Sequence, residues 1–268
     1  MERKQLVEQI HTKKSFLCVG LDTAIDRIPK HLLGEEDPIF AFNKAIVEAT
    51  LPYAIAYKPN WAFYEALGAS GMESLRKTLE IIPDNVMVVA DAKRGDIGNT
   101  ARMYAKAFFE ELDVDAITLA PYMGKDAIDP FLDRSNKWAF VLALTSNPGA
   151  ADLQYHDNGN EKIYQRVLRL GQEWAAEQLG EVGFVVGATR AEAMAEIRSL
   201  APDSFFLVPG IGAQGGDLQG VCKYGRSRDG GLLINSSRGI IYAGSGEDFA
   251  ARAAEAAAKL QGEMKNFI

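Results

Sequence analysis

The chain of 268 residues is poor in cysteine and histidine, and it has no excess of positive charge. Its two cysteines, Cys18 and Cys222, lie in apolar or mixed segments without a C-x-x-C partner, which predicts small buried side chains rather than a disulfide or a metal site. The three histidines, His11, His31 and His156, have no second ligand at metal-binding spacing. The cysteines and histidines therefore indicate no metal site.

Two further absences concern charge and long apolar runs. The formal net charge of −7, without a local basic patch, argues against nucleic acid or an anionic membrane as the main partner. No apolar run approaches the ~20 residues of a membrane span, and the polar, amphipathic start does not resemble a secretion signal. These features predict a cytoplasmic protein.

Eight short β-branched or aliphatic runs alternate with longer helical patterns along the chain. The runs are Phe16–Asp22, Ala54–Trp61, Val86–Lys93, Ala116–Met123, Ala139–Ser146, Val182–Ala188, Ser204–Gly212 and Leu232–Arg238. This alternation is typical of a (β/α)8 TIM barrel, whose usual size of about 250 residues leaves no room for a second domain. We expect an α/β fold with one barrel domain over residues 1–268, including an N-terminal helix; a doubly wound open sheet is the alternative.

Capping residues and periodicity indicate several of the helices. Helix starts are predicted at Asp37-Pro38, at Asp217 and at the box Ser245-x-x-Asp248. The clearest periodic helix has an apolar face formed by Ile163, Val167, Leu170 and Trp174. Two long connections directly follow predicted strands, which places them at the functional rim of a barrel: residues 23–37 and 147–160.

Polar side chains mark the ends of the predicted strands. Asp22 ends the first strand, Lys58 the second, Asp91 and Lys93 the third, and Ser146 the fifth. Because side chains alternate along a strand, Asp91 and Lys93 are expected to point to the same side. A lone Asp-x-Lys would indicate a solvated ion pair, but several acids and lysines at strand ends of one barrel indicate a site.

The segment Asp91-Ala92-Lys93-Arg94-Gly95-Asp96-Ile97-Gly98-Asn99-Thr100 resembles the signature of the orotidine 5′-monophosphate decarboxylases. Further segments resemble the family's pattern in the family's order: Leu21-Asp22, Tyr57-Lys58-Pro59-Asn60, Ser146-Asn147-Pro148-Gly149 and the run from Pro209 to Asp217. The resemblance spans about residues 21 to 240 and is closest to the bacterial branch with the Asp-Ala-Lys-Arg-Gly-Asp signature. One departure is Ser237, where commoner branches place a glycine before the arginine.

The resemblance implies decarboxylation of orotidine 5′-monophosphate to uridine 5′-monophosphate in de novo pyrimidine synthesis, without metal or cofactor. It implies that Lys93 protonates C6 of the pyrimidine and that Asp91 lies beside the departing carboxylate. Lys58 and Asp22 resemble the members that hold this array and contact the ribose. The chemistry is consistent, because loss of carbon dioxide leaves a localised carbanion that needs a preorganised cation and then a proton.

The resemblance also implies a symmetric homodimer. Asp96 lies beyond the third strand, and in the family such an aspartate reaches the active site of the neighbouring subunit. Thr100 would follow it and lie near the substrate, although a threonine at this place can also serve as a helix N-cap. We therefore expect a shared site.

A glycine-rich turn follows the seventh predicted strand. The run Gly210-Ile-Gly-Ala-Gln-Gly215 spells the G-x-G-x-x-G of dinucleotide folds, but that fingerprint belongs in an early strand–turn–helix unit. A glycine turn after strand seven and an arginine after strand eight match instead the usual phosphate site of a barrel. We interpret Gln214, Gly215 and Arg238 as phosphate contacts, and the family match implies that Ser146 contacts the pyrimidine edge.

Two alternatives remain open from the sequence. A magnesium-dependent sugar-phosphate decarboxylase or aldolase of the same superfamily shares the Asp-x-Lys-x-x-Asp spacing, but it has a carboxylate where this chain has Lys58, and an ammonium there repels a divalent cation. A non-catalytic nucleotide-phosphate binding protein would keep the glycine turn and Arg238 without needing Lys93.

Overall fold

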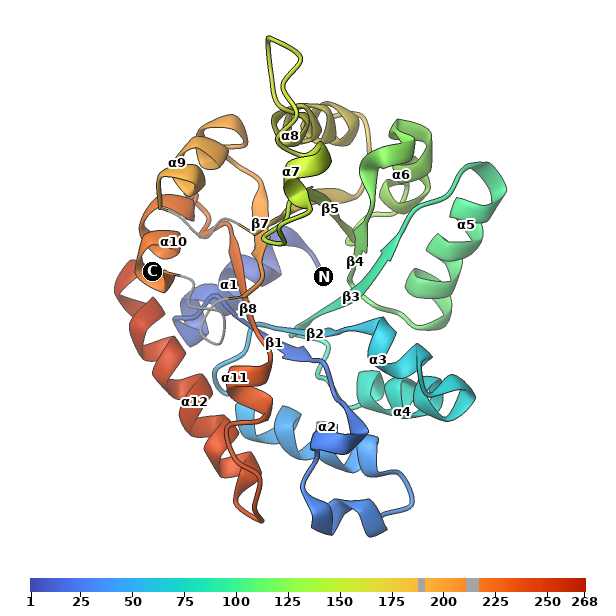
Figure 1. Ribbon diagram of the computed structural model, residues 1–268, viewed down its shortest axis with the longest axis vertical. Coiled ribbons are helices and arrows are strands. Elements are labelled where there is room, and N and C mark those ends of the chain that lie inside the picture. The colour runs from blue at the N-terminus through green and yellow to red at the C-terminus, as the bar shows by residue number, and fades with distance from the viewer. Residues whose placement is uncertain (188–190, 211–216) are drawn as a thin grey trace.

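Eight parallel strands close into one barrel in the computed structural model, which describes residues 1–187, 191–210 and 217–268. The strands follow one another around the ring in chain order, and β1 closes it by pairing with β8, with Leu17 opposite Ile234. Helices surround the ring (Figure 1). The strands are β1 (Leu17–Leu21), β2 (Ala56–Pro59), β3 (Met87–Arg94), β4 (Ala116–Leu119), β5 (Trp138–Leu144), β6 (Glu181–Val186), β7 (Phe205–Val208) and β8 (Leu232–Ser236).

The outer layer contains long helices and several short turns. The α-helices are α1 (Arg3–Lys13), α2 (Pro38–Thr50), α3 (Trp61–Glu65), α4 (Gly68–Glu80), α5 (Gly98–Lys106), α6 (Lys125–Leu132), α7 (Ala150–Leu153), α8 (Ile163–Ala175), α9 (Ala191–Leu200), α10 (Leu218–Gly225), α11 (Arg238–Ile241) and α12 (Phe249–Met264). The short turns are η1 (Ile25–Arg27), η2 (Lys30–Gly34), η3 (Ala107–Glu111, a π-helical turn), η4 (Pro121–Met123) and η5 (Lys265–Phe267).

The predicted (β/α)8 barrel and all eight predicted strands are confirmed, but most strands end earlier than predicted. The fourth strand ends at Leu119, because Pro121 begins the 3₁₀ turn η4 and lacks the N–H that a strand ladder needs. The predicted ends of the sixth and seventh runs, Ala188 and Gly212, lie outside the described residues. Hydrophobic patterning does not mark where a strand ends and its loop begins, so the predicted runs include the first residues of the loops.

The helix starts at Asp37 and Asp217 are confirmed, since each carboxylate accepts a backbone N–H three residues ahead. The helix start after the Ser245-x-x-Asp248 box is confirmed, since α12 begins at Phe249 with Asp248 as its N-cap, but the Asp248 side chain makes no capping hydrogen bond.

The predicted apolar face of α8 is confirmed in part: Trp174 is buried and Val167 and Leu170 pack partly buried against the core, but the buried face is centred one residue further along the helix. Ile163 is exposed, and the buried residues are Tyr164, Leu168, Gly171 and Trp174. The reason is close packing at a glycine, because a Cβ at Gly171 would lie 2.6 Å from the Phe184 ring.

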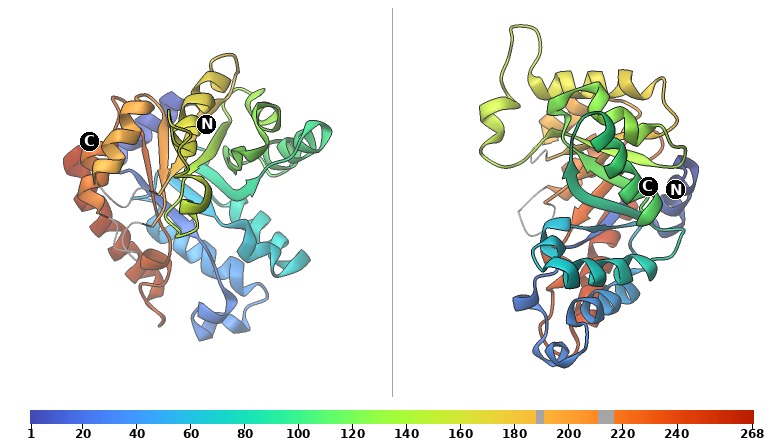
Figure 2. Two further views of the ribbon diagram at one scale, coloured as in Figure 1. Left: turned by 45° about the horizontal axis from the view of Figure 1, so that its top comes forward. Right: turned by 90° about the vertical axis from the view of Figure 1, so that its right-hand side faces the viewer.

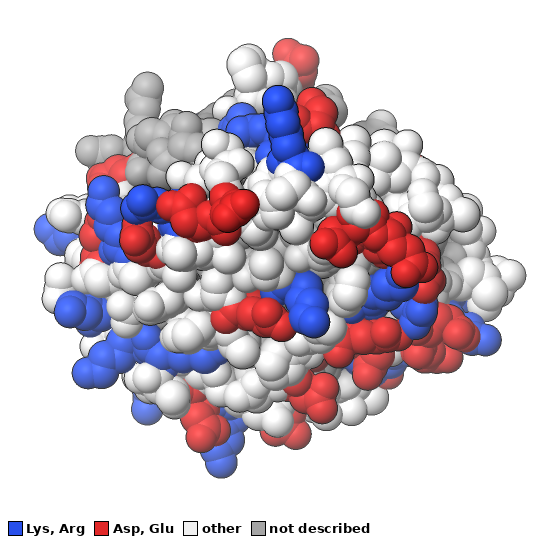
Figure 3. All heavy atoms as spheres, turned by 90° about the horizontal axis from the view of Figure 1, so that it is seen from below, with Lys and Arg blue, Asp and Glu red and all other residues white. Residues whose placement is uncertain are grey.

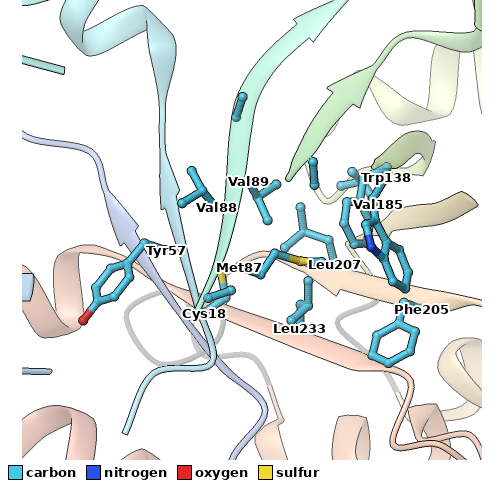
Figure 4. Packing of buried hydrophobic residues seen from close by; sticks show 14 of the residues in the cluster. Cys18, Tyr57, Met87, Val88, Val89, Trp138, Val185, Phe205, Leu207 and Leu233 are labelled. Atoms are coloured by element: carbon cyan, nitrogen blue, oxygen red, sulfur yellow. The ribbon is translucent and has the colours of Figure 1, made fainter. Parts of the chain in front are cut away.

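Hydrophobic side chains fill the inside of the barrel and the layer between strands and helices. In Figure 4, Cys18, Met87, Leu207 and Leu233 gather towards the middle of the ring, whereas Tyr57 points outward. The Tyr57 hydroxyl donates to the Val47 carbonyl on α2. Alternation along β2 then directs the next residue, Lys58, into the barrel. Both cysteines are free and buried, as predicted.

The two long connections after β1 and β5 are confirmed, and each contains short helical turns. Figures 1 and 2 show the segment between β5 and α8 projecting from the body of the molecule. On the face drawn in Figure 3, acidic and basic side chains lie side by side, so this face offers no broad surface of one charge. Within the described residues, no helix is long and apolar enough to cross a membrane.

Candidate active site

Three adjacent strands bring charged side chains together at the carboxyl end of the barrel. Asp22 directly follows β1, Lys58 lies in β2 and Asp91 in β3, and all three point inward through the alternation that also directs Met87 and Cys18 into the barrel. The first two strands pair in regular register, with Gly20 opposite Lys58. The strand ends therefore carry the predicted cluster at the rim where barrel enzymes place their chemistry.

Asp91 is the centre of this cluster. Its Oδ2 atom accepts from Lys58 Nζ at 2.7 Å, and its Oδ1 atom accepts from Lys93 Nζ at 2.5 Å. Lys58 Nζ also lies 3.9 Å from Asp22 Oδ1. Lys58 is 5% exposed and Asp91 11% exposed, whereas Lys93 is 51% exposed. One ammonium is thus fixed inside the barrel, and the other is accessible at its mouth.

Burial and charge oppose each other in the pKa values of this cluster. Burial raises the pKa of Asp91, but the charges of Lys58 and Lys93 outweigh it and lower that pKa to about 2. For Lys58, burial lowers the pKa, and the Asp91 and Asp22 carboxylates outweigh it and raise the pKa above its ordinary value. Asp91 is therefore an anion and Lys58 a cation at neutral pH.

Lys93 reaches Asp91 through an irregular backbone rather than through regular alternation. Its φ is 46°, a left-handed conformation that is uncommon for a residue with a side chain. The β3–β4 register shifts between Ala90 and Arg94. The prediction that Asp91 and Lys93 meet is confirmed by their ion pair, although a strand irregularity makes the contact.

A cavity of about 350 Å³ opens beside the cluster. A larger cavity of about 690 Å³ lies at the opposite end, near the starts of β3 and β4, away from the charged cluster. Since barrel enzymes act at the carboxyl ends of their strands, the smaller cavity is the candidate site. Its lining combines residues of β2, β3 and β8 with residues of the segments that follow β1, β2, β7 and β8: Asp22, Ala24, Arg27, Lys58, Asn60, Phe63, Asp91, Pro209, Gly210, Asn235, Ser237, Arg238 and Tyr242.

The remaining predicted site residues divide into three groups. Arg238 lines the cavity, at the start of α11. Ser146, Asp96 and Thr100 are not among the residues that line it; Ser146 and Thr100 are exposed, and Asp96 is partly exposed. Gln214 and Gly215 lie outside the described residues.

The alternative interpretation of Thr100 as an N-cap is wrong. Helix α5 begins at Gly98, and its N-cap is Ile97. Thr100 is therefore the third residue inside the helix, and its side chain is exposed rather than bonded at the helix start.

Tyr242 is a site residue that the sequence interpretation missed. Its hydroxyl accepts the N–H of Ala24 and donates to the carbonyl of Asp22, so it ties the end of β1 to α11. The guanidinium of Arg27 stacks on the Tyr242 ring, 4.0 Å from its centre. No local signal could have revealed this link, because the two ends lie 220 positions apart in the chain.

The model of the orotidine 5′-phosphate decarboxylase / HUMPS family matches residues 15–254. The chain belongs to this family. An orotidine 5′-phosphate decarboxylase of Phocaeicola vulgatus is 55% identical over 272 residues, covering 100% of this chain and 99% of that relative. One of Flavobacterium johnsoniae is 55% identical over 271 residues, covering 100% and 98%.

Solved structures of the decarboxylase family have the same fold. A putative orotidine-monophosphate decarboxylase of Toxoplasma gondii has a TM-score of 0.87 at 37% identity, covering 98% of this chain and 97% of that one. The OMP decarboxylase of Leishmania donovani has a TM-score of 0.81 at 38% identity, covering 98% and 99%. The similarity therefore extends over the whole barrel rather than over the signature alone.

Proposed function

We propose that this chain is a carboxy-lyase that converts orotidine 5′-monophosphate to uridine 5′-monophosphate in pyrimidine synthesis. The observation that carries the proposal is the ion-paired array of Asp22, Lys58, Asp91 and Lys93 at the mouth of a barrel of the decarboxylase family. The array places a fixed anion and an accessible ammonium side by side. These are the groups that a decarboxylation without an electron sink requires.

In the proposed reaction, the bond between C6 and the carboxylate carbon breaks and carbon dioxide leaves. The electron pair stays on C6, next to the ammonium of Lys93, which first stabilises the developing charge and then donates its proton to C6. Asp91 holds that ammonium and lies beside the departing carboxylate. Lys93 becomes a neutral amine and regains a proton from water after the product leaves.

The cavity supports binding of a nucleotide monophosphate. Arg238 lines it together with Gly210, the first residue of the glycine-rich turn. We propose that Arg238, Gln214 and Gly215 bind the phosphate, that Asp22 and Lys58 contact the ribose, and that Ser146 and Thr100 complete the pocket. Within the described residues, the buried Oδ1 atom of Asp22 has no hydrogen-bond partner, and a ribose hydroxyl would supply the missing donor.

The same array argues against the magnesium-dependent alternative. The buried ammonium of Lys58 lies 2.7 Å from Asp91 and 3.9 Å from Asp22, so it occupies the place between the two carboxylates that a divalent cation would take. Its positive charge repels such an ion. We propose that the reaction needs neither metal nor another cofactor.

We also propose a homodimer that completes the site, in the cytoplasm where free nucleotides are made. Within the described residues, Asp96 forms no ion pair, and its carboxylate accepts only the N–H of Ile97. The segments that follow β3 and β4 also expose apolar side chains: Ile97 by 53%, Met103 by 54% and Tyr122 by 90%. A second copy covering this surface would bury these side chains and bring Asp96 to the partner's array.

The direct test is an ultraviolet assay of the purified protein with orotidine 5′-monophosphate, with and without a chelator. We expect turnover to uridine 5′-monophosphate that the chelator leaves unchanged. Activity lost with the chelator and restored by magnesium would favour the metal-dependent alternative. Tight binding of uridine 5′-monophosphate without turnover would favour the non-catalytic binding protein.

A further inference from the structure

Thr118 in β4 lies against the irregular part of β3. The pairing of the two strands runs from Ala90 opposite Ile117 to Arg94 opposite Leu119, so four steps along β3 correspond to two steps along β4. Lys93 lies inside this irregularity, in its left-handed conformation. Such a backbone persists only where the surroundings hold it, and the regular ladder is interrupted here.

The hydroxyl of Thr118 supplies the missing contact. It accepts the backbone N–H of Lys93 at 2.9 Å and donates its own hydrogen to Asp91 Oδ1, with 3.1 Å between the oxygens. A hydroxyl has one donor and two acceptor positions, so both bonds form together. Thr118 is 1% exposed, and therefore water does not easily replace either bond.

Asp91 is thereby held from three sides. Its Oδ1 atom accepts from Thr118 and Lys93, and its Oδ2 atom accepts from Lys58. Of these three donors only Thr118 is uncharged, and only Thr118 contacts the backbone of Lys93 as well. One buried hydroxyl consequently fixes both the carboxylate and the backbone turn that carries the accessible ammonium.

We propose that Thr118 is a positioning residue for the decarboxylation, whose hydroxyl holds the Lys93 backbone and the Asp91 carboxylate in their reactive arrangement. The proposal rests on the proposed function for its kinetic consequence, but the hydrogen bonds themselves do not. A purely structural threonine would need only its shape, which valine reproduces. The hydroxyl itself is what the proposal requires.

The kinetic test compares Thr118→Val with Thr118→Ser. We expect valine to lower kcat roughly tenfold to a hundredfold, as for loss of a hydrogen bond to a charged group, with a smaller change in KM. Serine should restore most of kcat. Thr50→Val is the matched control, because Thr50 is equally buried but bonds the Ile46 carbonyl and the Tyr57 hydroxyl instead; its kcat should stay within about threefold of the parent.

Hydrogen exchange of the Lys93 amide tests the same contact without any turnover. The amide should be protected in the parent and in Thr118→Ser, and should exchange faster in Thr118→Val. An unprotected amide in the parent overturns the proposal even if the valine variant does not fold. A folded Thr118→Val variant with the kcat of the parent also overturns the proposal. A parent without turnover instead refutes the proposed function, and the exchange result still decides whether Thr118 holds Lys93.

Discussion

The ammonium of Lys58 lies 2.7 Å from Asp91 Oδ2, and both side chains are largely withdrawn from water. In a buried pair, removal of one partner leaves an uncompensated charge, so the two protonation states depend on each other. The pKa of Asp91 is lowered to about 2, which keeps it ionised throughout the neutral range.

The first prediction concerns the titration of Asp91. A lowered carboxyl pKa contributes stability above the unfolded value of about 3.9 that is lost as the pH falls towards 2. In a ¹³C NMR titration, the Asp91 carboxyl should therefore not titrate between pH 7 and about 4. Lys58→Met removes one cation and should raise that pKa. Lys77→Met, which removes a lysine paired with Asp37 instead, should not. Titration of the parent near pH 4 would contradict the assignment.

The second prediction separates chemistry from binding. Lys93→Ala removes the proposed proton donor, so kcat should fall by at least about a hundredfold. Uridine 5′-monophosphate should still bind within a few-fold of the parent affinity, measured by calorimetry, because the proposed phosphate contacts remain. Lys125→Ala, which removes an exposed lysine paired with Asp129, should change neither quantity. Parental turnover in Lys93→Ala would rule out its role as the acid.

The third prediction tests the shared site. Lys93→Ala and Asp96→Ala should each be inactive alone, but a mixed dimer contains one site with both residues intact. Mixing the variants with subunit exchange should recover up to about one quarter of the parent activity per site, as expected for random pairing of equal amounts in a two-fold dimer. Differently tagged subunits allow exchange to be verified. Absence of recovery after verified exchange would mean that Asp96 serves its own subunit.

The fourth prediction concerns stability at the opposite end of the barrel. The guanidinium of Arg198 lies 3.7 Å above the Phe206 ring and donates to the carbonyls of Ala201, Pro202, Ser204, Gly225 and Gly231. Arg198→Met leaves these carbonyls without their donor and should lower the free energy of unfolding by ~2–4 kcal/mol. Urea unfolding measures this, with the exposed Arg228→Met as control. An unchanged midpoint would show that the carbonyls find other donors.

The fold could be predicted from the sequence because it depends on local patterns. Eight apolar runs and the caps at Asp37 and Asp217 need only neighbouring residues to be interpreted. The centre of the buried face of α8 could not be predicted, because its contact with the barrel includes Gly171, which carries no hydrophobic signal. A periodic pattern identifies large apolar residues, but it does not identify a glycine at which a helix packs closely against a strand.

The charged residues of the candidate site could also be predicted from the sequence. Strand alternation brings Asp22, Lys58 and Asp91 to one end of the barrel, and the signature points to Lys93. The contacts that hold these residues were not predictable. Thr118 in β4 and Tyr242 after α11 each act through one hydroxyl group on residues distant in the chain, and nothing in their sequence neighbourhoods distinguishes them from packing residues.

The position of Asp91 between two ammonium groups limits how such a protein can be re-engineered. A neutral residue there would leave Lys58 and Lys93 facing each other, and replacing either lysine alone would leave surplus negative charge in the array. Directed evolution that samples one position at a time would thus meet inactive intermediates on every route. New substrate preference in this scaffold calls for libraries in which opposite charges are exchanged together.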